Sequence, residues 1–196
     1  MNYVIKNVNE FDQDLINTFY PNVYYQKKMK TKKRRNKKTS IIGEILLSNL
    51  LNEYNINYND LIFKVNSFGK PYIVNVPIYF NISHSFDYVI VTTSDKEIGI
   101  DIEKIRKVNI NTINYFATDN EKKYILSSKK NVEERLFKIY TLKEAYFKMK
   151  GTNLDKVFDV EFTICNSDIT CNDKNVNLGF INTIDGYCIS YCERNK

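Results

Sequence analysis

The chain of 196 residues is 43% hydrophobic, 14% aromatic and 27% charged, with a formal net charge of +6. This composition supports a packed core and excludes a wholly disordered protein, and six glycines with three prolines exclude a collagen-like or linker-dominated architecture. No apolar run approaches the roughly 18–20 residues of a membrane span, and the first residues lack the features of a signal peptide, so we expect a cytoplasmic protein without a membrane partner.

The predicted elements alternate between strands and helices in two batches. Strands are expected at 3–5, 62–65, 71–74, 78–80, 88–93, 98–103, 158–162, 178–181 and 187–192, and helices from Thr39 or Ser40 onward and at 132–150. The strands at 88–93 and 98–103 are separated by a short polar turn, which predicts a β-hairpin. The pattern favours an α+β fold with two similar-sized halves, 1–97 and 98–196, packed as one unit.

The basic residues are concentrated in one segment. Nine of the twelve residues from Lys27 to Lys38 are Lys or Arg, and no acidic residue occurs between Asp14 and Glu44. Subtracting these nine charges from +6 leaves −3 for the rest of the chain. The segment is expected to attract a polyanion, such as nucleic acid, anionic lipid, a phosphorylated small molecule or an acidic protein, although a solvated face is an equally good interpretation.

The clearest helix is predicted at 132–150. Asn131 and Glu134 have the spacing of a capping box at its start, and Gly151 is suited to its end. On this helix Glu144 and Lys148 are i,i+4 neighbours. An ordinary surface ion pair explains them, and a metal-binding carboxylate beside a phosphate-binding cation is the functional alternative.

Two carboxylates follow each other on the strand at 98–103. Because side chains alternate along a strand, the isoleucines point to the core, whereas Gly99, Asp101 and Glu103 share the other face. Their spacing of about 7 Å suits ligands of one hard cation, and the glycine leaves room for a ligand to approach. Taken alone, this hexapeptide favours an amphipathic strand with solvated acids.

Two further segments contain groups suited to phosphate. His84, the only histidine, lies in Asn81–Ser85 after a predicted strand, where it either forms a structural hydrogen bond or donates to phosphate. The absence of a second histidine counts strongly against a Ser-His-Asp hydrolase. Lys70 lies in the predicted turn Phe68–Tyr72, which does not have the spacing of a phosphate-binding Walker A loop.

The four cysteines lie in the last 32 residues, at positions 165, 171, 188 and 192. Their spacing does not fit a zinc site well, because only the last pair is close. Cys188 and Cys192 share one face of a predicted strand, so we expect small buried thiols there.

Taken together and in this order, the motifs resemble the Sfp type of the 4′-phosphopantetheinyl transferase superfamily. The signature of that family is a short Gly-x-Asp strand followed some 40–45 residues later by Lys-Glu-(Ala/Ser)-x-x-Lys. Here Ile98–Asp101 is followed by Lys143–Lys148, with Lys143 42 residues after Asp101. Tyr140 stands where the family often has Trp, and Thr39 where it often has Arg.

The resemblance implies a fold of two pseudo-symmetric α/β halves and an enzyme that acts as a monomer on two partners. It would transfer the 4′-phosphopantetheine arm of coenzyme A to a serine of an apo acyl or peptidyl carrier protein and release adenosine 3′,5′-bisphosphate. The ligands of the family's Mg²⁺ correspond to Asp101, Glu103 and Glu144, and its pyrophosphate-binding lysine corresponds to Lys148.

The resemblance also implies contacts to coenzyme A and a candidate base. The implied coenzyme contacts are Lys27, Ser40, Lys70, Pro71, Ser83 and His84. Of these, Ser83 and His84 correspond to phosphate ligands, whereas Lys70 and Pro71 correspond to residues near the adenine and its 3′-phosphate. Glu121 is the nearest match to the family's candidate general base.

Alternatives remain open at this level. A metal-dependent phosphohydrolase or nuclease would use the same three carboxylates and would bind nucleic acid through the basic segment. A non-enzymatic nucleic-acid-binding module fits less well, because the rest of the chain is net acidic. Carrier proteins of fatty-acid, polyketide and nonribosomal-peptide synthesis fit the resemblance equally.

Overall fold

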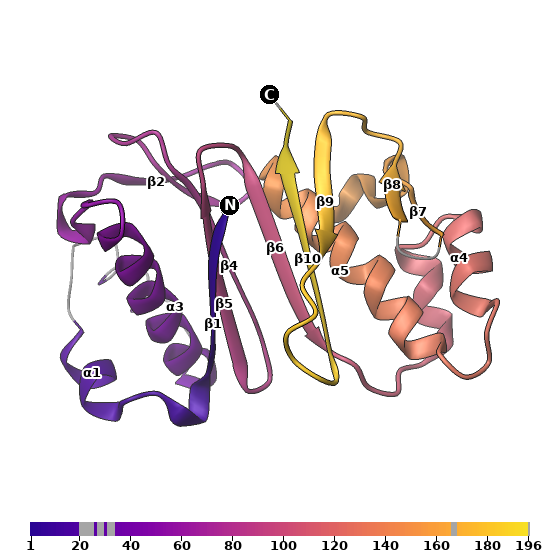
Figure 1. The fold of residues 1–196 in the computed structure, drawn as a ribbon, viewed down its shortest axis with the longest axis horizontal. Coiled ribbons are helices and arrows are strands. Elements are labelled where there is room, and N and C mark those ends of the chain that lie inside the picture. The colour runs from indigo at the N-terminus through magenta and orange to yellow at the C-terminus, as the bar shows by residue number, and fades with distance from the viewer. Residues whose placement is uncertain (20–25, 27–29, 31–33, 166–167, 196) are drawn as a thin grey trace.

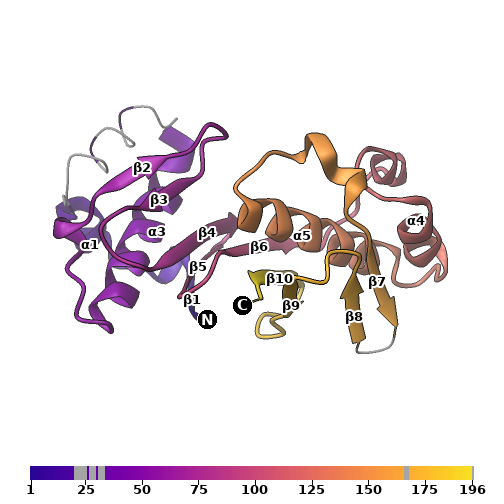
Figure 2. The same ribbon diagram turned by 90° about the horizontal axis from the view of Figure 1, so that it is seen from above.

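The structure is a computed structural model that describes residues 1–19, 26, 30, 34–165 and 168–195, with only the backbone described at 34–36 (Figure 1). Half of the basic segment, residues 27–29 and 31–33 with Lys27 among them, therefore lies outside the described residues. The predicted α+β class is confirmed, because two small antiparallel sheets each have a long helix packed against them (Figure 1, Figure 2). None of the helices in the described part of the chain is long and apolar enough to cross a membrane.

The first sheet has the strand order β1-β5-β4. It consists of β1 (Asn2–Asn7), β4 (Tyr79–Ser85) and β5 (Tyr88–Ser94), and the accompanying elements are α1 (Gln13–Thr18), α3 (Arg34–Asn52) and the hairpin of β2 (Phe63–Val65) with β3 (Pro71–Ile73). The apolar side of α3 packs on this sheet through fully buried residues such as Ile42 and Leu47. The helix starts earlier than predicted, since the Lys and Arg residues before Thr39 favour helical backbone.

The second sheet has the order β6-β10-β9. It consists of β6 (Ile98–Lys104), β9 (Val176–Phe180) and β10 (Tyr187–Arg194), and it is accompanied by α4 (Asp119–Leu126), α5 (Val132–Lys150) and the hairpin of β7 (Phe162–Cys165) with β8 (Asp168–Cys171). Within the described residues, short 3-10 helices also connect elements of both halves, at Val8–Glu10, Tyr58–Asp60, Ile110–Tyr115 and Leu154–Asp159. The last of these covers the first two residues of the strand predicted at 158–162, and the strand forms later, as β7 from Phe162.

The predicted hairpin of 88–93 with 98–103 is wrong. Both edges of β5 are already paired, with β1 on one side and β4 on the other, so no edge is left for β6. The chain instead crosses after Ser94 into the second sheet, where β6 pairs with β10. As a result β6 lies beside β4 at the junction of the two sheets (Figure 1).

Helix α5 has the predicted bounds, and it lies unusually close to β6. A Cβ atom added at Gly99 would lie 2.0 Å from the backbone oxygen of Ala145, so only glycine allows this approach. Gly151 ends the helix in the left-handed conformation, with φ of +67°, as predicted. The predicted cap by Asn131 is wrong, because its backbone is not extended and its side chain makes no capping hydrogen bond.

The thiols of Cys188 and Cys192 are buried against α5, as expected. Both are free, and burial raises the pKa of Cys188 to about 11. Their chemistry is therefore that of small core side chains.

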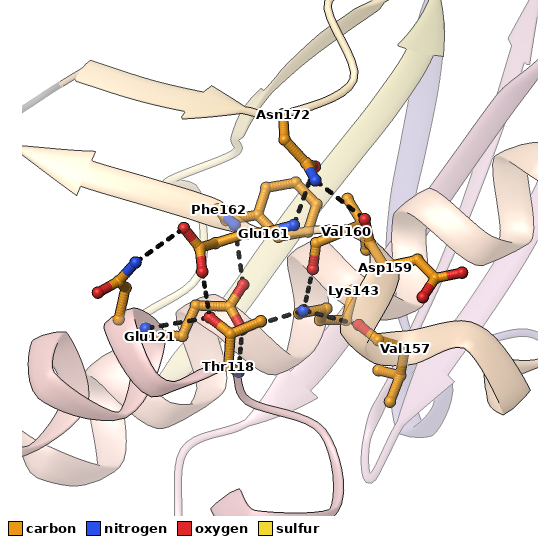
Figure 3. Close-up of polar contacts among 10 residues, drawn as sticks. Thr118, Glu121, Lys143, Val157, Asp159, Val160, Glu161, Phe162 and Asn172 are labelled. Atoms are coloured by element: carbon orange, nitrogen blue, oxygen red, sulfur yellow. Dashed lines mark hydrogen bonds and ion pairs between the residues drawn. The ribbon is translucent and has the colours of Figure 1, made fainter.

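A buried ion pair joins α5 to α4 (Figure 3). The ammonium of Lys143, 1% exposed as a side chain, lies 3.0 Å from Oε2 of Glu121, whose side chain is 0% exposed. Lys143 also donates to the backbone oxygens of Val157, at 2.8 Å, and Val160. Burial lowers the pKa of Lys143, and the carboxylate of Glu121 opposes that effect.

The same glutamate satisfies two backbone amides. Its carboxylate accepts from the amide of Thr118 at the start of α4 and from the amide of Phe162 at the start of β7, both at 2.8 Å. With Thr118 it forms a capping box. Glu121 thereby connects α4, α5 and the β7–β8 hairpin and limits rotation of α5 about its axis.

This network predicts that Glu121→Gln destabilises the protein by about 3–5 kcal/mol, since the ammonium of Lys143 stays buried without its counter-charge. Gln keeps only one of the two acceptor oxygens, so the loss includes the hydrogen bond to one backbone amide as well as the charge. Unfolding in urea at pH 7 measures it. Glu134→Gln on α5 removes an exposed partner of Lys138 and is the control, with an expected cost of about 0.5 kcal/mol. Equal stability of the two variants would contradict the role of the pair.

Candidate active site

Three carboxylates gather where α5 crosses β6. Asp101 and Glu103 point from β6 toward the helix, on the face that Gly99 opens, and Glu144 comes from the helix. Burial raises the pKa of Glu144, and the negative charges of Asp101 and Glu103 raise it further. The structure therefore brings together the three acids that the sequence predicted as metal ligands; we call them the acid cluster.

Lys148 supplies positive charge to the acid cluster. Its ammonium lies 2.5 Å from Oδ1 of Asp101 and 3.1 Å from the hydroxyl of Ser83. It also lowers the pKa of Glu144, against the effect of the two other acids. Glu144 and Lys148 are neighbours, as predicted, but they belong to a cluster of three acids and one lysine and do not form an isolated surface ion pair.

One oxygen of the acid cluster has no partner. Asp101 is 4% exposed, and its Oδ2 is buried without a hydrogen bond in the described structure. Hard cations such as Mg²⁺ prefer carboxylate oxygens, so this atom and the mutually repelling charge on Glu144 fit a divalent cation. Across the described residues, however, no three acidic, histidine or cysteine side chains are arranged tightly enough to hold a metal as they stand.

Tyr140 and Arg106 complete the surroundings of the acids. The hydroxyl of Tyr140 is hydrogen-bonded to Glu144, and burial together with that carboxylate raises the tyrosine pKa. The guanidinium of Arg106 lies 3.2 Å from Oε2 of Glu103. Both residues also line a cavity of about 330 Å³ that reaches Glu103, so this acid of the cluster borders an open space.

Two serines of β4 contact the acids directly. Ser83 donates to Oδ1 of Asp101 and Ser85 donates to Oε2 of Glu103, each at 2.8 Å. Sequence reasoning placed this motif after a strand and gave no role to Ser85. The signal was present, since residues 83 and 85 share one face once the segment is a strand.

The other predicted residues lie elsewhere. His84 is exposed on β4, and Ser40 is buried on α3. The ammonium of Lys70 donates to the backbone oxygens of Ile98, at 3.2 Å, and Met149, at 3.1 Å, and burial lowers its pKa to about 8. Lys70 thereby ties the β2–β3 hairpin to both β6 and the end of α5.

Glu121 is not brought to the acid cluster. It is fully buried in the ion pair with Lys143, among residues of α4 and the segment that leads into β7 (Figure 3). Proton acceptance from a substrate needs contact with that substrate, so this placement favours the structural role over the predicted one as a base.

Two family profiles match the chain. The one described as the 4′-phosphopantetheinyl transferase superfamily matches residues 97–193, and the one described as 4′-phosphopantetheinyl transferase, N-terminal, matches residues 14–96. A solved structure, the holo-[acyl-carrier-protein] synthase (AcpS) of Thermotoga maritima, is 24% identical and aligns over 51% of this chain and 63% of its own, with a TM-score of 0.43.

Several curated proteins are similar in sequence. The 4′-phosphopantetheinyl transferase gsp of Aneurinibacillus migulanus is 33% identical over 155 residues, which are 76% of this chain and 65% of that protein. The transferases ffp of Bacillus subtilis and Sfp of Bacillus subtilis strain 168 are 32% and 28% identical over 123 residues, or 61% of this chain and 55% of each.

The chain thus spans between about half and two thirds of the curated relatives that it matches. The two profiles together extend from residue 14 to residue 193, and the profile that matches residues 97–193 includes both the β6 carboxylates and the Lys-Glu motif of α5. The chain belongs to the 4′-phosphopantetheinyl transferase superfamily.

Proposed function

We propose that the protein transfers the 4′-phosphopantetheine arm of coenzyme A to a serine of an apo acyl or peptidyl carrier protein, with Mg²⁺, and releases adenosine 3′,5′-bisphosphate. The observation that carries this proposal is the acid cluster, in which Asp101, Glu103 and Glu144 converge beside Lys148. The serine oxygen of the carrier would form a bond to the phosphorus that bears pantetheine, and the bond from this phosphorus to the diphosphate bridging oxygen would break.

The residues of the cluster have distinct tasks in this proposal. Asp101, Glu103 and Glu144 would hold the Mg²⁺, which supplies charge neutralisation for the diphosphate and its leaving phosphate. Lys148 has its ammonium already placed among these acids and would stabilise negative charge on the transferred phosphoryl group. Tyr140 and Arg106 orient the carboxylates of Glu144 and Glu103.

The N-terminal half, residues 1–97, would supply the contacts to coenzyme A. The proposed contacts are Lys27, Ser40, Lys70, Pro71, Ser83 and His84. A cavity of about 290 Å³ lined by Lys70, Pro71 and the following residues to Phe80 supports an adenine site there. The ammonium of Lys70 is engaged by backbone oxygens, so its backbone and stem are the parts available to the nucleotide.

We further propose that the coenzyme binds between this half and residues 98–196, in a monomeric cytoplasmic enzyme. The proposal is tested by incubating the chain with coenzyme A, Mg²⁺ and a panel of apo carrier proteins. A mass gain of about 340 Da on the carrier serine, the size of the arm, is the expected result. Cleavage of DNA or RNA without that gain would favour the nuclease alternative.

Removal of a proposed metal ligand is expected to abolish transfer. Asp101→Ala and Glu144→Ala should lower the rate by at least about 100-fold, because each removes a ligand from the charge centre that acts on the transition state. Circular dichroism checks the fold of both variants. Wild-type rates in both would overturn the metal assignment.

Lys148→Ala is expected to lower kcat more than it raises KM for the carrier, since its ammonium lies in the cluster and would act on the reacting phosphoryl group. Steady-state kinetics with varied carrier measures both constants. A raised KM with unchanged kcat would instead make Lys148 a docking residue.

Glu144→Gln is expected to raise the Tm of the metal-free protein at pH 7.5, on the order of 2–4 °C. Because the pKa of Glu144 is raised, the folded protein binds the carboxyl proton of Glu144 more tightly than the unfolded chain does. At pH values above that pKa the carboxylate is charged in both states, and its charge lowers the stability of the folded state. The gain should vanish near pH 4, below the ordinary glutamate pKa of about 4.3.

Thermal unfolding with and without Mg²⁺ completes this test. Saturating Mg²⁺ should stabilise the wild type more than the variant, which reverses the order of their Tm values. A variant that is less stable than the wild type without metal would show that the acids do not repel one another.

A further inference from the structure

The two sheets meet along a seam between β4 and β6, which lie side by side. Among the described residues, the backbone ladder of β4 is formed with β5 and that of β6 with β10, so no ladder joins the two strands across the seam. Side chains of β4 bridge the gap: Asn81 accepts from the amide of Ile100 at 3.0 Å, Ser83 from Ile102 at 3.4 Å and Ser85 from Lys104 at 3.2 Å. The constant offset of 19 residues shows that the two strands run in parallel.

The two serines of the seam have a second task that Asn81 does not share. A hydroxyl has one proton to donate, and in Ser83 and Ser85 this proton goes to the carboxylates of Asp101 and Glu103. The residue on β6 in line with Asn81 is Gly99, which has no side chain to receive a bond. The two β4 residues that lie opposite acids are therefore both serines, whose hydroxyl can accept from an amide and donate to a carboxylate at the same time.

The hydroxyl of Ser83 makes three hydrogen bonds within the seam. Its oxygen accepts from the amide of Ile102 and from Lys148, and its only proton points to Asp101. Each amide donating to a serine oxygen also strengthens the bond that this serine makes to its acid. The arrangement is that of an orienting group for a carboxylate.

The seam determines which oxygen of Asp101 is available. Oδ1 is taken by Ser83 at 2.8 Å and by Lys148 at 2.5 Å, whereas Oδ2 is buried and without a partner among the described residues. Oε2 of Glu103 is held in the same way by Ser85 and Arg106. Each of the two carboxylates is thus held in place through hydrogen bonds to one of its two oxygens.

We infer that Ser83 and Ser85 are positioning residues that set the orientation of Asp101 and Glu103 for binding a divalent cation, through a seam that links one sheet to the metal ligands of the other. This inference rests on the proposed function for the presence of the metal. Loss of a residue that orients a metal ligand typically weakens metal affinity by 10–100-fold.

The test is the affinity of the full chain for Mn²⁺ alone, measured from the electron paramagnetic resonance of free Mn²⁺, without coenzyme or carrier. Ser83→Ala and Ser85→Ala should each weaken binding by about 10–100-fold. Ser83→Thr, which keeps a hydroxyl, should restore most of the affinity.

Thr93→Val provides a matched control. Thr93 lies on β5 of the same sheet, is fully buried, and its hydroxyl has no partner in the described structure. Valine has nearly the same size as threonine, so the replacement removes a buried hydroxyl from the sheet and changes no contact to an acid. The affinity for Mn²⁺ should therefore stay at the wild-type value. Thermal unfolding shows that each variant is folded.

The outcomes separate the inference from the function. Wild-type Mn²⁺ affinity in folded Ser85→Ala, and in Ser83→Ala where it folds, would overturn the inference even if the wild type transfers phosphopantetheine. Failure of the wild type to modify any carrier, with weakened Mn²⁺ binding in the variants, would overturn the function alone. A wild type that binds no Mn²⁺ would overturn both.

Discussion

The crowding of negative charge beneath α5 is the constraint on which the rest of the structure depends. Asp101 and Glu103 lie close enough to Glu144 for their negative charges to raise its pKa, in a place that is mostly withdrawn from water. Such an arrangement is unfavourable without positive charge. Here the positive charge comes from Lys148 and Arg106, and hydroxyls of Ser83, Ser85 and Tyr140 supply hydrogen bonds.

Two lysines of α5 show how one helix combines stability with chemistry. The ammonium of Lys143 is surrounded by Glu121 and two backbone oxygens. Lys148, five residues later, is partly exposed and binds Oδ1 of Asp101, whose Oδ2 has no partner in the described structure. The first pair fixes the helix against α4 and the β7–β8 hairpin. That anchoring, with the close approach at Gly99, directs Glu144 and Lys148 toward β6.

Local patterns were sufficient to predict the parts of the site that depend on one element. The alternation along 98–103 predicted the shared face of Asp101 and Glu103, and helical spacing predicted the bounds of α5. The prediction of a hairpin at 88–103 failed because pairing depends on which strand edges are already taken, and that is a property of the whole sheet. The structural role of Glu121 and the seam serines were missed for a similar reason, since their partners are 18 to 41 residues away along the chain.

The most direct test of the account is a crystal structure of the protein grown with Mn²⁺ and coenzyme A, with anomalous diffraction measured at the manganese edge. The account predicts one strong anomalous peak in contact with carboxylate oxygens of Asp101, Glu103 and Glu144, with Oδ2 of Asp101 among the ligands. A metal peak held by other residues, or acids that turn away from one another when manganese and coenzyme are bound, would contradict it.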